Sequence, residues 1–491
     1  MSDEQKRFLV AFLFIIIILL VWSYITKPQP THRATIPISE DTISFKKKEI
    51  VPVISVDTIV VEKDNIRYVF SAAGGAIKSF YLRNYKIDIV PPEKYLFTTI
   101  ISDSVYQFDY KLYSDSLVFT KNFATREIRK VYHFNQDNGF TIKIDADTLL
   151  QILSVRDGLA VTETKNKSDD LRHFSVYIQD EKFSKISQNI KEKLEYNSNW
   201  KWLAMRNKYF VLILNNLSGI EKTELYKLSA LKSEINEAYL GCGVSGNTFR
   251  FGIDIYGKEN IEISALLLPI RYSELVRFEK GYEQIIGGGI WNPIARVILQ
   301  ILNFFYSLFK NYGIVIIIFA IILKIIFFPL SRQMLISQQK MQLLQPELKK
   351  LQQKYKDDPQ ALNREMMHLY KTYQVNPFSG CLPLLIQFPI FIALYQVLST
   401  SIEFRQAPFV LWITDLSLRD PYYVLPVGMG IMMLIQSLMT TIDPRQKFMV
   451  IMMPLVMIFV FLNFPSGLQL YWFTYNILSF IEQLIIKKKI F

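Results

Sequence analysis

Hydrophobic residues are concentrated at the two ends of the 491-residue chain. Residues 8–25 carry no charge, and the uncharged runs 372–402, 421–442 and 448–481 fill most of the last quarter. A helix needs about 20 apolar residues to cross the hydrocarbon core of a bilayer. The pattern therefore predicts membrane-spanning helices at both ends of the chain and excludes a wholly soluble protein.

The first apolar run is preceded by Lys6 and Arg7 and followed by Lys27. A cleavable signal peptide is the alternative, but its apolar core has about 7–15 residues and ends at small residues. This run is longer and has no A-x-A site. We therefore predict an uncleaved anchor over residues 1–26, with its amino terminus in the cytoplasm, followed by a proline-rich extended linker over 27–56.

Residues 57–280 show a different pattern of short runs rich in β-branched and aromatic residues, separated by Gly, Asn, Asp and Ser. Such runs without helical patterns between them predict an all-β sandwich of two sheets. The predicted strands include Thr58–Val61, Asn65–Phe70, Leu117–Thr120, Thr141–Ile144, Leu159–Thr162, Phe174–Ile178, Tyr209–Leu214 and Phe251–Tyr256.

Gly287–Gly289 predicts a hinge, and residues 290–310 follow it with apolar residues at helical spacing. Polar residues such as Arg296 and Asn303 fall on or near the other side. This pattern favours an amphipathic helix in the plane of the membrane interface. An ordinary helix docked on the sandwich is the alternative.

Residues 311–491 predict a core of five membrane-spanning helices. The 34-residue run 448–481 is divided by Phe464-Pro465-Ser466-Gly467, because Pro and Gly together indicate a turn. A re-entrant hairpin is the alternative there. The predicted spans are about 312–330, 379–400, 422–441, 449–463 and 468–486.

Lysine and arginine are distributed unevenly around these spans. One side collects fifteen of them, eight within 331–376, whereas the loop 401–420 on the other side holds two. Positive charge marks the cytoplasmic side. We therefore predict a multi-pass protein with both termini in the cytoplasm and the large β domain outside, which in a diderm bacterium is the periplasm.

Composition excludes several classes of function. Two cysteines and four histidines leave no room for a disulfide scaffold or a multi-histidine metal site. The chain has no H-E-x-x-H, Walker A or G-x-S-x-G motif. The net charge of +12 suits a protein that faces anionic lipid and ribosomal RNA. We expect no enzymatic activity, no cofactor, no metal and no DNA binding.

Lys324 is the most informative residue, because a charge inside a span costs about 2.5–3.5 kcal/mol and by default marks a polar pathway. Snorkelling is the alternative, since Lys324 lies only seven residues before Ser331. Gln387, Gln436 and Asn476 also lie within predicted spans. Such polar side chains either hold helices together or line a hydrated cavity.

The loop 331–376 predicts a cytoplasmic helical hairpin, because apolar residues recur at helical spacing on both sides of Asp357-Asp358-Pro359. Several of these apolar positions are methionines, including Met334, Met341 and Met366. Methionine suits an adaptable contact surface, although ordinary packing within the hairpin explains it equally well.

The last 200 residues contain an ordered series of motifs: Phe328–Ser331, Glu365–Tyr370, Asn376–Leu398, Glu403–Trp412, Asp420–Tyr423, and Phe464–Leu468 with Tyr471-Trp472 and Asn476. This series closely resembles the YidC/Oxa/Alb family of membrane protein insertases. Two earlier segments, Ala73–Ile77 and Trp202–Phe210, also resemble pieces of the periplasmic domain of the bacterial YidC form. That domain is a β-supersandwich similar to sugar-mutarotase folds, so the resemblance agrees with the strand pattern.

The resemblance implies a hydrophilic groove between the five core helices, open to the cytoplasm and to lipid. It places the positive groove residue on Lys324, where most relatives have arginine. It assigns the groove wall to Gln387, Gln436, Trp472 and Asn476.

The resemblance also implies that the hairpin contacts clients or partners, and we assign this contact to Met334, Met341, Met366 and Met367. Nascent membrane proteins are the expected clients, inserted without nucleotide hydrolysis, alone or with the Sec translocon. The ribosome and the signal recognition machinery are further expected partners. The chain stops soon after Lys487–Lys489, so ribosome tethering through a long basic tail is not expected.

Two other classes of function stay open on the sequence alone. A membrane-anchored carbohydrate-binding or mutarotase-like module would make residues 57–275 the active part, with paired carboxylates in a sugar pocket. A channel or transporter would need Lys324 to conduct or couple ions.

Overall fold

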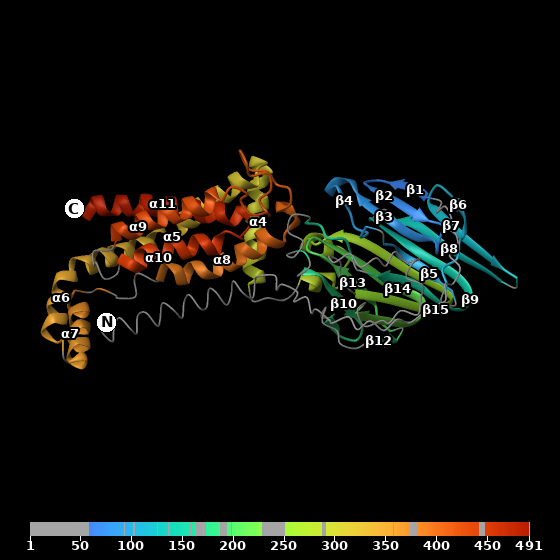
Figure 1. Ribbon diagram of the computed structural model, residues 1–491, viewed down its shortest axis with the longest axis horizontal. Coiled ribbons are helices and arrows are strands. Elements are labelled where there is room, and N and C mark those ends of the chain that lie inside the picture. The colour runs from blue at the N-terminus through green and yellow to red at the C-terminus, as the bar shows by residue number, and fades with distance from the viewer. Residues whose placement is uncertain are drawn as a thin grey trace, which may run out of the picture. The chain divides into compact units, whose positions relative to one another are not determined.

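The computed structural model of the protein describes most of residues 58–490. The predicted anchor, linker and glycine hinge lie outside the described residues. The described residues form two compact units, a β unit before Gly287 and a helical unit after Gly288, and each is described by itself (Figure 1). The residues left out between 58 and 490 are 93, 102–103, 125, 136–137, 157–158, 164–169, 171–172, 187–193, 198, 228–250, 287–290, 357, 374, 376–381 and 441–446.

The β unit is built from antiparallel strands and ends in two short helices, α3 (Tyr272–Val276) and η4 (Tyr282–Ile286). The strands are β1 (Thr58–Lys63), β2 (Ile66–Ser71), β3 (Ala76–Leu82), β4 (Ile87–Asp88), β5 (Leu96–Ile100), β6 (Asp109–Leu112), β7 (Ser116–Phe123), β8 (Arg126–Asn135), β9 (Gly139–Arg156), β10 (Ser175–Gln179), β11 (Phe183–Ile186), β12 (Leu194–Asn197), β13 (Trp202–Arg206), β14 (Phe210–Lys227) and β15 (Phe251–Pro269).

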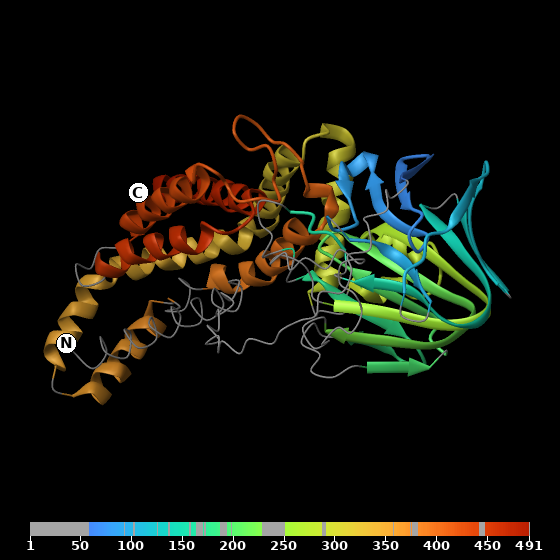
Figure 2. The same cartoon turned by 45° about the vertical axis from the view of Figure 1, so that its right-hand side comes forward.

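Hydrogen bonds join the described strands into one sheet, with the main order β1-β2-β3-β5-β9-β15-β14-β13-β10-β11. The predicted all-β sandwich is confirmed, but its strands belong to one continuous sheet instead of two. The reason is that β9, β14 and β15 have 18 or 19 residues each and pair along most of their length (Figure 2). Their register shifts mark β-bulges, which bend a strand, so one bent sheet encloses the core that two sheets would enclose.

Leu159–Thr162 was predicted as a strand, but it is irregular. Its backbone makes one hydrogen bond to the residue after β4, from Ala160 N to Ile89 O at 2.8 Å, and at Thr162 it bonds to a buried carboxylate. Asp170 Oδ2 accepts hydrogen bonds from the backbone N–H and the hydroxyl of Thr162 and from the N–H of Glu163, and its Oδ1 accepts from Lys208 N at 3.0 Å. An apolar run alone does not reveal such a competing acceptor.

The segment Trp202–Phe210 forms β13, a tight turn and the start of β14. Asn207 makes the turn, because its Oδ1 accepts from the N–H groups of Tyr209 and Phe210 at 3.1 and 2.8 Å. Trp202 packs edge-on against Tyr282 with ring centroids 5.4 Å apart. Burial raises the pKa of the Tyr282 hydroxyl to about 12. The end of the β unit is thereby fixed to its core.

The two glycines of Ala73–Ile77 lie between β2 and β3. Gly74 and Gly75 have φ of +66° and +54°, in the left-handed region that favours glycine. A Cβ on Gly74 would lie 2.7 Å from the Thr98 side chain and 3.2 Å from the backbone of Thr99. This motif therefore needs glycine both for its backbone conformation and for the close approach of β5.

The helical unit contains α4 (Asn292–Phe309), α5 (Tyr312–Leu343), α6 (Gln345–Lys354), α7 (Pro359–Thr372), α8 (Leu382–Thr400), α9 (Val424–Thr440), α10 (Lys447–Phe461) and α11 (Ser466–Ile490). Among the described residues, α5 is the helix that is long and apolar enough to cross a membrane. The shorter apolar helices are Gln387–Thr400, Val424–Met439 and Ile451–Phe461.

Helix α5 is longer than the sequence predicted. It begins after Asn311, whose side chain accepts hydrogen bonds from the N–H groups of Gly313 and Ile314. It continues through Pro329 to Leu343 without a break at 330. The predicted span and the first part of the predicted hairpin are therefore one helix.

Helix α4 packs on α5 and α8 within the helical unit. It buries Ala295, Ile298 and Leu302, while Phe304 and Leu308 on its outer side are more than 60% exposed. An outer apolar surface is what an interfacial helix requires. Its position in a membrane interface stays a prediction.

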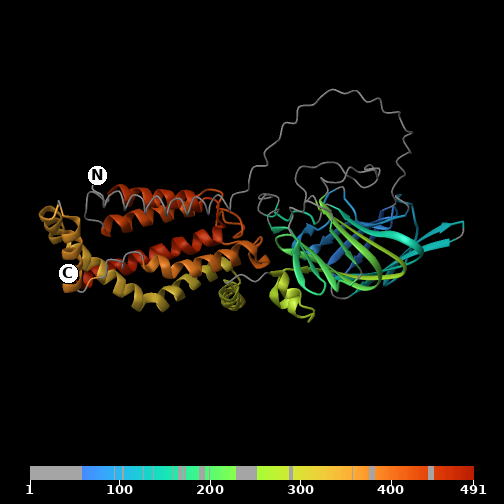
Figure 3. The ribbon, with the colours of Figure 1, turned by 90° about the horizontal axis from the view of Figure 1, so that it is seen from below.

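Helices α6 and α7 pack on each other at the end of the helical unit opposite to α4 (Figure 3). Leu344, Leu348 and Val375 form the small buried cluster between them, and Met341 and Met366 pack against it. These methionines therefore take part in packing within the hairpin.

The other two methionines of the predicted contact surface lie in different surroundings. Met334 is buried on α5, and Met367 on α7 is 53% exposed.

We predict that Gly74→Ala destabilises the β unit by about 2–5 kcal/mol, because the new Cβ adds overpacking against β5 to the cost of a left-handed alanine. Gly281→Ala is the matched control: its φ is +77°, but its Cβ would meet only the flexible end of Gln284. Gly281→Ala should lower the free energy of unfolding of the β unit by about 1–2 kcal/mol. Hydrogen exchange of β3 and β5 peptides in the full chain measures the difference, and equal losses in both variants would refute the role of crowding.

Candidate functional site around Lys324

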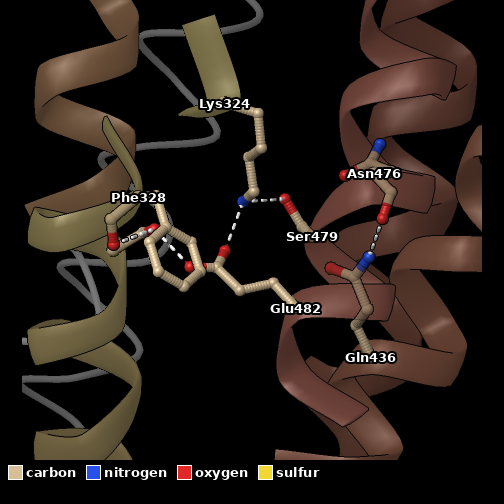
Figure 4. Close-up of polar contacts among 7 residues, drawn as sticks. Lys324, Phe328, Gln436, Asn476, Ser479 and Glu482 are labelled. Carbon is tan, nitrogen blue, oxygen red and sulfur yellow. Dashed lines mark hydrogen bonds and ion pairs between the residues drawn. The ribbon is translucent and has the colours of Figure 1, made fainter. Parts of the chain in front are cut away.

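Lys324 lies on α5 with its side chain directed towards α11 (Figure 4). Its Nζ is 2.7 Å from Glu482 Oε2 and donates to Ser479 Oγ at 2.8 Å. The ring of Tyr475 lies 4.7 Å from the same nitrogen, in cation–π geometry. The residue as a whole is only 9% exposed. An ammonium in the interior of the helical unit is thus surrounded by three groups from one helix.

The spacing of these partners explains why α11 presents them together. Tyr475, Ser479 and Glu482 are four and three residues apart, so they share one face of the helix. On α5, Ser331 lies two turns after Lys324 and donates to Glu482 Oε1 at 2.5 Å. Glu482 therefore bridges the two residues of α5.

Sequence reasoning identified Lys324 but missed Glu482. A signal was available, because Glu482 is the one charged residue between Lys447 and Lys487. A lone carboxylate in an otherwise uncharged segment needs a partner as much as a lone ammonium does. The structure brings the two lone charges together.

The predicted wall residues Gln387 and Gln436 also contact α11. On α8, Gln387 is buried and its Nε2 donates to the hydroxyl of Tyr471. On α9, Gln436 Nε2 donates to the backbone oxygen of Asn476 at 2.6 Å (Figure 4). Helix α11 is thus the common partner of polar side chains from α5, α8 and α9.

Trp472 and Asn476 lie one turn apart on α11, and both are more than 90% buried. Trp472 packs in the apolar core, with its ring 5.3 Å from Phe391 and 5.4 Å from Phe461. Within the part of the chain that the structure describes, Trp472 Nε1 and Asn476 Nδ2 have no hydrogen-bond acceptor. Two buried donors without acceptors are unusual and indicate a place for water or for a bound backbone.

A polar pocket on the β unit bears on the carbohydrate alternative. Its polar lining consists of Asn65, Asn84, Tyr85, Asn138 and Glu274. Glu274 is the one carboxylate in this lining, whereas the alternative expects a pair. Among the described residues, no group of three His, Cys, Asp or Glu side chains could hold a metal ion.

Comparison with known proteins places the chain among insertases. The family model of the 60Kd inner membrane protein matches residues 304–491. The membrane protein insertase YidC of Geotalea daltonii is 33% identical over 540 residues, covering 99% of each chain. That of Geobacter sulfurreducens is 50% identical over 210 residues, which cover 42% of this chain and 40% of the relative.

A solved structure of an active YidC insertase, with its first transmembrane domain resolved, is also similar. It covers 87% of this chain and 92% of its own, at 20% identity and a TM-score of 0.42. The relatives are named as insertases and not as enzymes. Because the match at 33% identity extends over 99% of both sequences, the chain belongs to the YidC family of membrane protein insertases.

Proposed function

We propose that this protein inserts nascent membrane proteins into the inner membrane and that the polar face of α11, together with Lys324, is the surface that receives their translocated segments. The insertase family and its description as inner membrane proteins support the first part. The observation that carries the second part is the buried ammonium of Lys324 amid polar groups of α11. Lys324 is the one charged residue in the apolar first part of α5, residues 312–330.

The physical task of an insertase is to carry polar residues through an apolar slab. The cost falls when the slab is thinner, and the 15-residue α10 is only about 23 Å long against a hydrocarbon core of about 30 Å. It falls further when polar groups within the membrane replace lost water. The client's own apolar helix then enters lipid and gains about 25 cal/mol per Å² of apolar surface removed from water. No nucleotide is needed.

The groove wall consists of Gln387, Gln436, Trp472 and Asn476 in this proposal. The donors of Trp472 and Asn476 that have no acceptor support it, because a client backbone or a water molecule would satisfy them. Lys324 supplies the charge, which attracts an acidic residue in the client by about 4 kcal/mol at 4 Å in a medium of effective dielectric near 20.

The topology is part of the same proposal. Helices α5, α8, α9, α10 and α11 cross the membrane, both termini are cytoplasmic, and the β unit is periplasmic. The distribution of lysine and arginine supports this orientation. The α6–α7 hairpin then lies in the cytoplasm, where it meets clients, the Sec translocon, the ribosome or the signal recognition machinery. Met367 is the exposed methionine of the proposed contact set.

We predict that Lys324→Leu slows insertion of a single-span client with an acidic translocated tail by tenfold or more, because that tail loses its attracting charge. Lys324→Arg should retain insertion. The measurement is nucleotide-free insertion into proteoliposomes, and a client with an uncharged tail serves as the control. Equal insertion of the acidic client by wild type and Lys324→Leu would contradict the groove-charge role.

We predict that deletion of residues 57–275 leaves insertion of the same client largely intact, because the helical unit has its own core. The carbohydrate alternative predicts the opposite, since it makes the β unit the active part. Insertion per mole of reconstituted protein is the measurement. Complete loss of insertion in a deletion that still reconstitutes would favour the alternative.

A further inference from the structure

The ammonium of Lys324 is already surrounded by groups of the protein. A lysine carries three N–H donors. In the structure the Nζ pairs with Glu482 at 2.7 Å, donates to Ser479 at 2.8 Å and is covered by the ring of Tyr475 at 4.7 Å. All three partners belong to the protein itself. A client carboxylate can reach this ammonium only if one of them leaves, and Glu482 is the partner with the same chemistry as the incoming group.

We propose that Glu482 is a specificity-determining residue that occupies Lys324 in the resting insertase and is displaced by an acidic side chain of the client. This proposal rests on the proposed role of Lys324 as the groove charge. Glu482 competes with the client for the same ammonium. The net attraction of a client is therefore the difference between two interaction energies, that of its carboxylate with Lys324 and that of Glu482 with Lys324.

The surroundings of Glu482 fit a group that exchanges partners. Its side chain is 4% exposed, so it is not solvated in the resting state. Its other oxygen accepts from Ser331 Oγ at 2.5 Å, and Ser331 lies seven residues after Lys324 on α5. After displacement the carboxylate keeps this hydrogen bond.

Exchange of one carboxylate for another on Lys324 lets the insertase distinguish acidic from uncharged clients at little net cost in free energy. An acidic client replaces one ion pair by another of the same kind, whereas an uncharged client leaves the pair between Lys324 and Glu482 intact. A bare ammonium at this depth would instead be poorly tolerated in the resting protein, because a buried charge needs a partner. Glu482 thus stabilises the charge of Lys324 in the resting protein and makes Lys324 selective for acidic clients.

The test uses two single-span clients that differ only by Asp or Asn at one position of the translocated tail. For each variant of the full-length protein in proteoliposomes, the charge ratio is the initial insertion rate of the Asp client divided by that of the Asn client. Glu482→Gln keeps the shape and the acceptor for Ser331 but removes the competing charge. We expect it to raise the charge ratio about fivefold or more, equivalent to about 1 kcal/mol.

Ser331→Ala should change the charge ratio in the opposite direction. In the resting state Glu482 has both Lys324 and Ser331, whereas after displacement Ser331 is its remaining partner of the two. The hydrogen bond to the unpaired carboxylate is the stronger one, so its loss makes displacement harder and the ratio falls. Glu62→Gln is the matched control, because it makes the same chemical change in an exposed ion pair of the β unit with Arg83. It should leave the ratio at the wild-type value.

The outcomes separate this proposal from the proposed function. If Glu482→Gln leaves the charge ratio unchanged or slows both clients equally, Glu482 is a structural partner and the proposal is wrong. If Glu482→Gln does not fold, an unchanged ratio in Ser331→Ala overturns it just as well. The double variant Lys324→Leu/Glu482→Gln tests the function itself: a ratio near one supports the groove charge, and a wild-type ratio would remove Lys324 from the mechanism.

Discussion

The helical unit depends on one electrostatic constraint: an ammonium held among apolar helices must have a counter-charge and hydrogen-bond acceptors. Leaving one member of a buried ion pair alone costs about 3–5 kcal/mol. Lys324 meets this constraint entirely through α11, and Ser331 completes the shell of Glu482. The pairing therefore fixes both the rotation and the axial position of α11 against α5, because a shift of either helix by one residue would separate the two charges.

The same helix satisfies the polar side chains of its other neighbours. Gln387 on α8 and Gln436 on α9 both donate to α11. The contacting residues Tyr471, Tyr475, Ser479 and Glu482 recur at helical spacing, so they form a polar stripe along the middle of α11. Such a stripe is costly in lipid unless something polar uses it. Function and structure are thus linked at α11, since the contacts that hold the bundle together also create its polar surface.

The two buried lysines Lys130 and Lys324 differ in the groups that their ammonium nitrogens contact. In the β unit, the Nζ of Lys130 donates to the backbone oxygens of Gly74 and Phe97 and to Thr99 Oγ1, with no carboxylate among these acceptors. Complete burial lowers the pKa of Lys130 well below its usual range. Lys324 has a carboxylate instead. The first lysine joins neighbouring segments of the β unit, and the second forms an ion pair between two helices.

Apolar runs and turn signals were sufficient to predict an all-β unit followed by an apolar helical unit, because both depend on local patterns. Details set by distant partners were not predictable in this way. The irregular path at Leu159–Thr162 depends on the Asp170 carboxylate, and the single bent sheet depends on bulges within strands of 18 or 19 residues.

Lys324 and Glu482 lie 158 positions apart, yet each is the lone charge of its apolar segment. The next charged residue comes eight residues after Lys324 and five residues after Glu482. Two opposite charges at similar depths in two spans have few partners other than each other. Matching lone charges by depth is therefore a rule that predicts this contact from the amino-acid sequence alone.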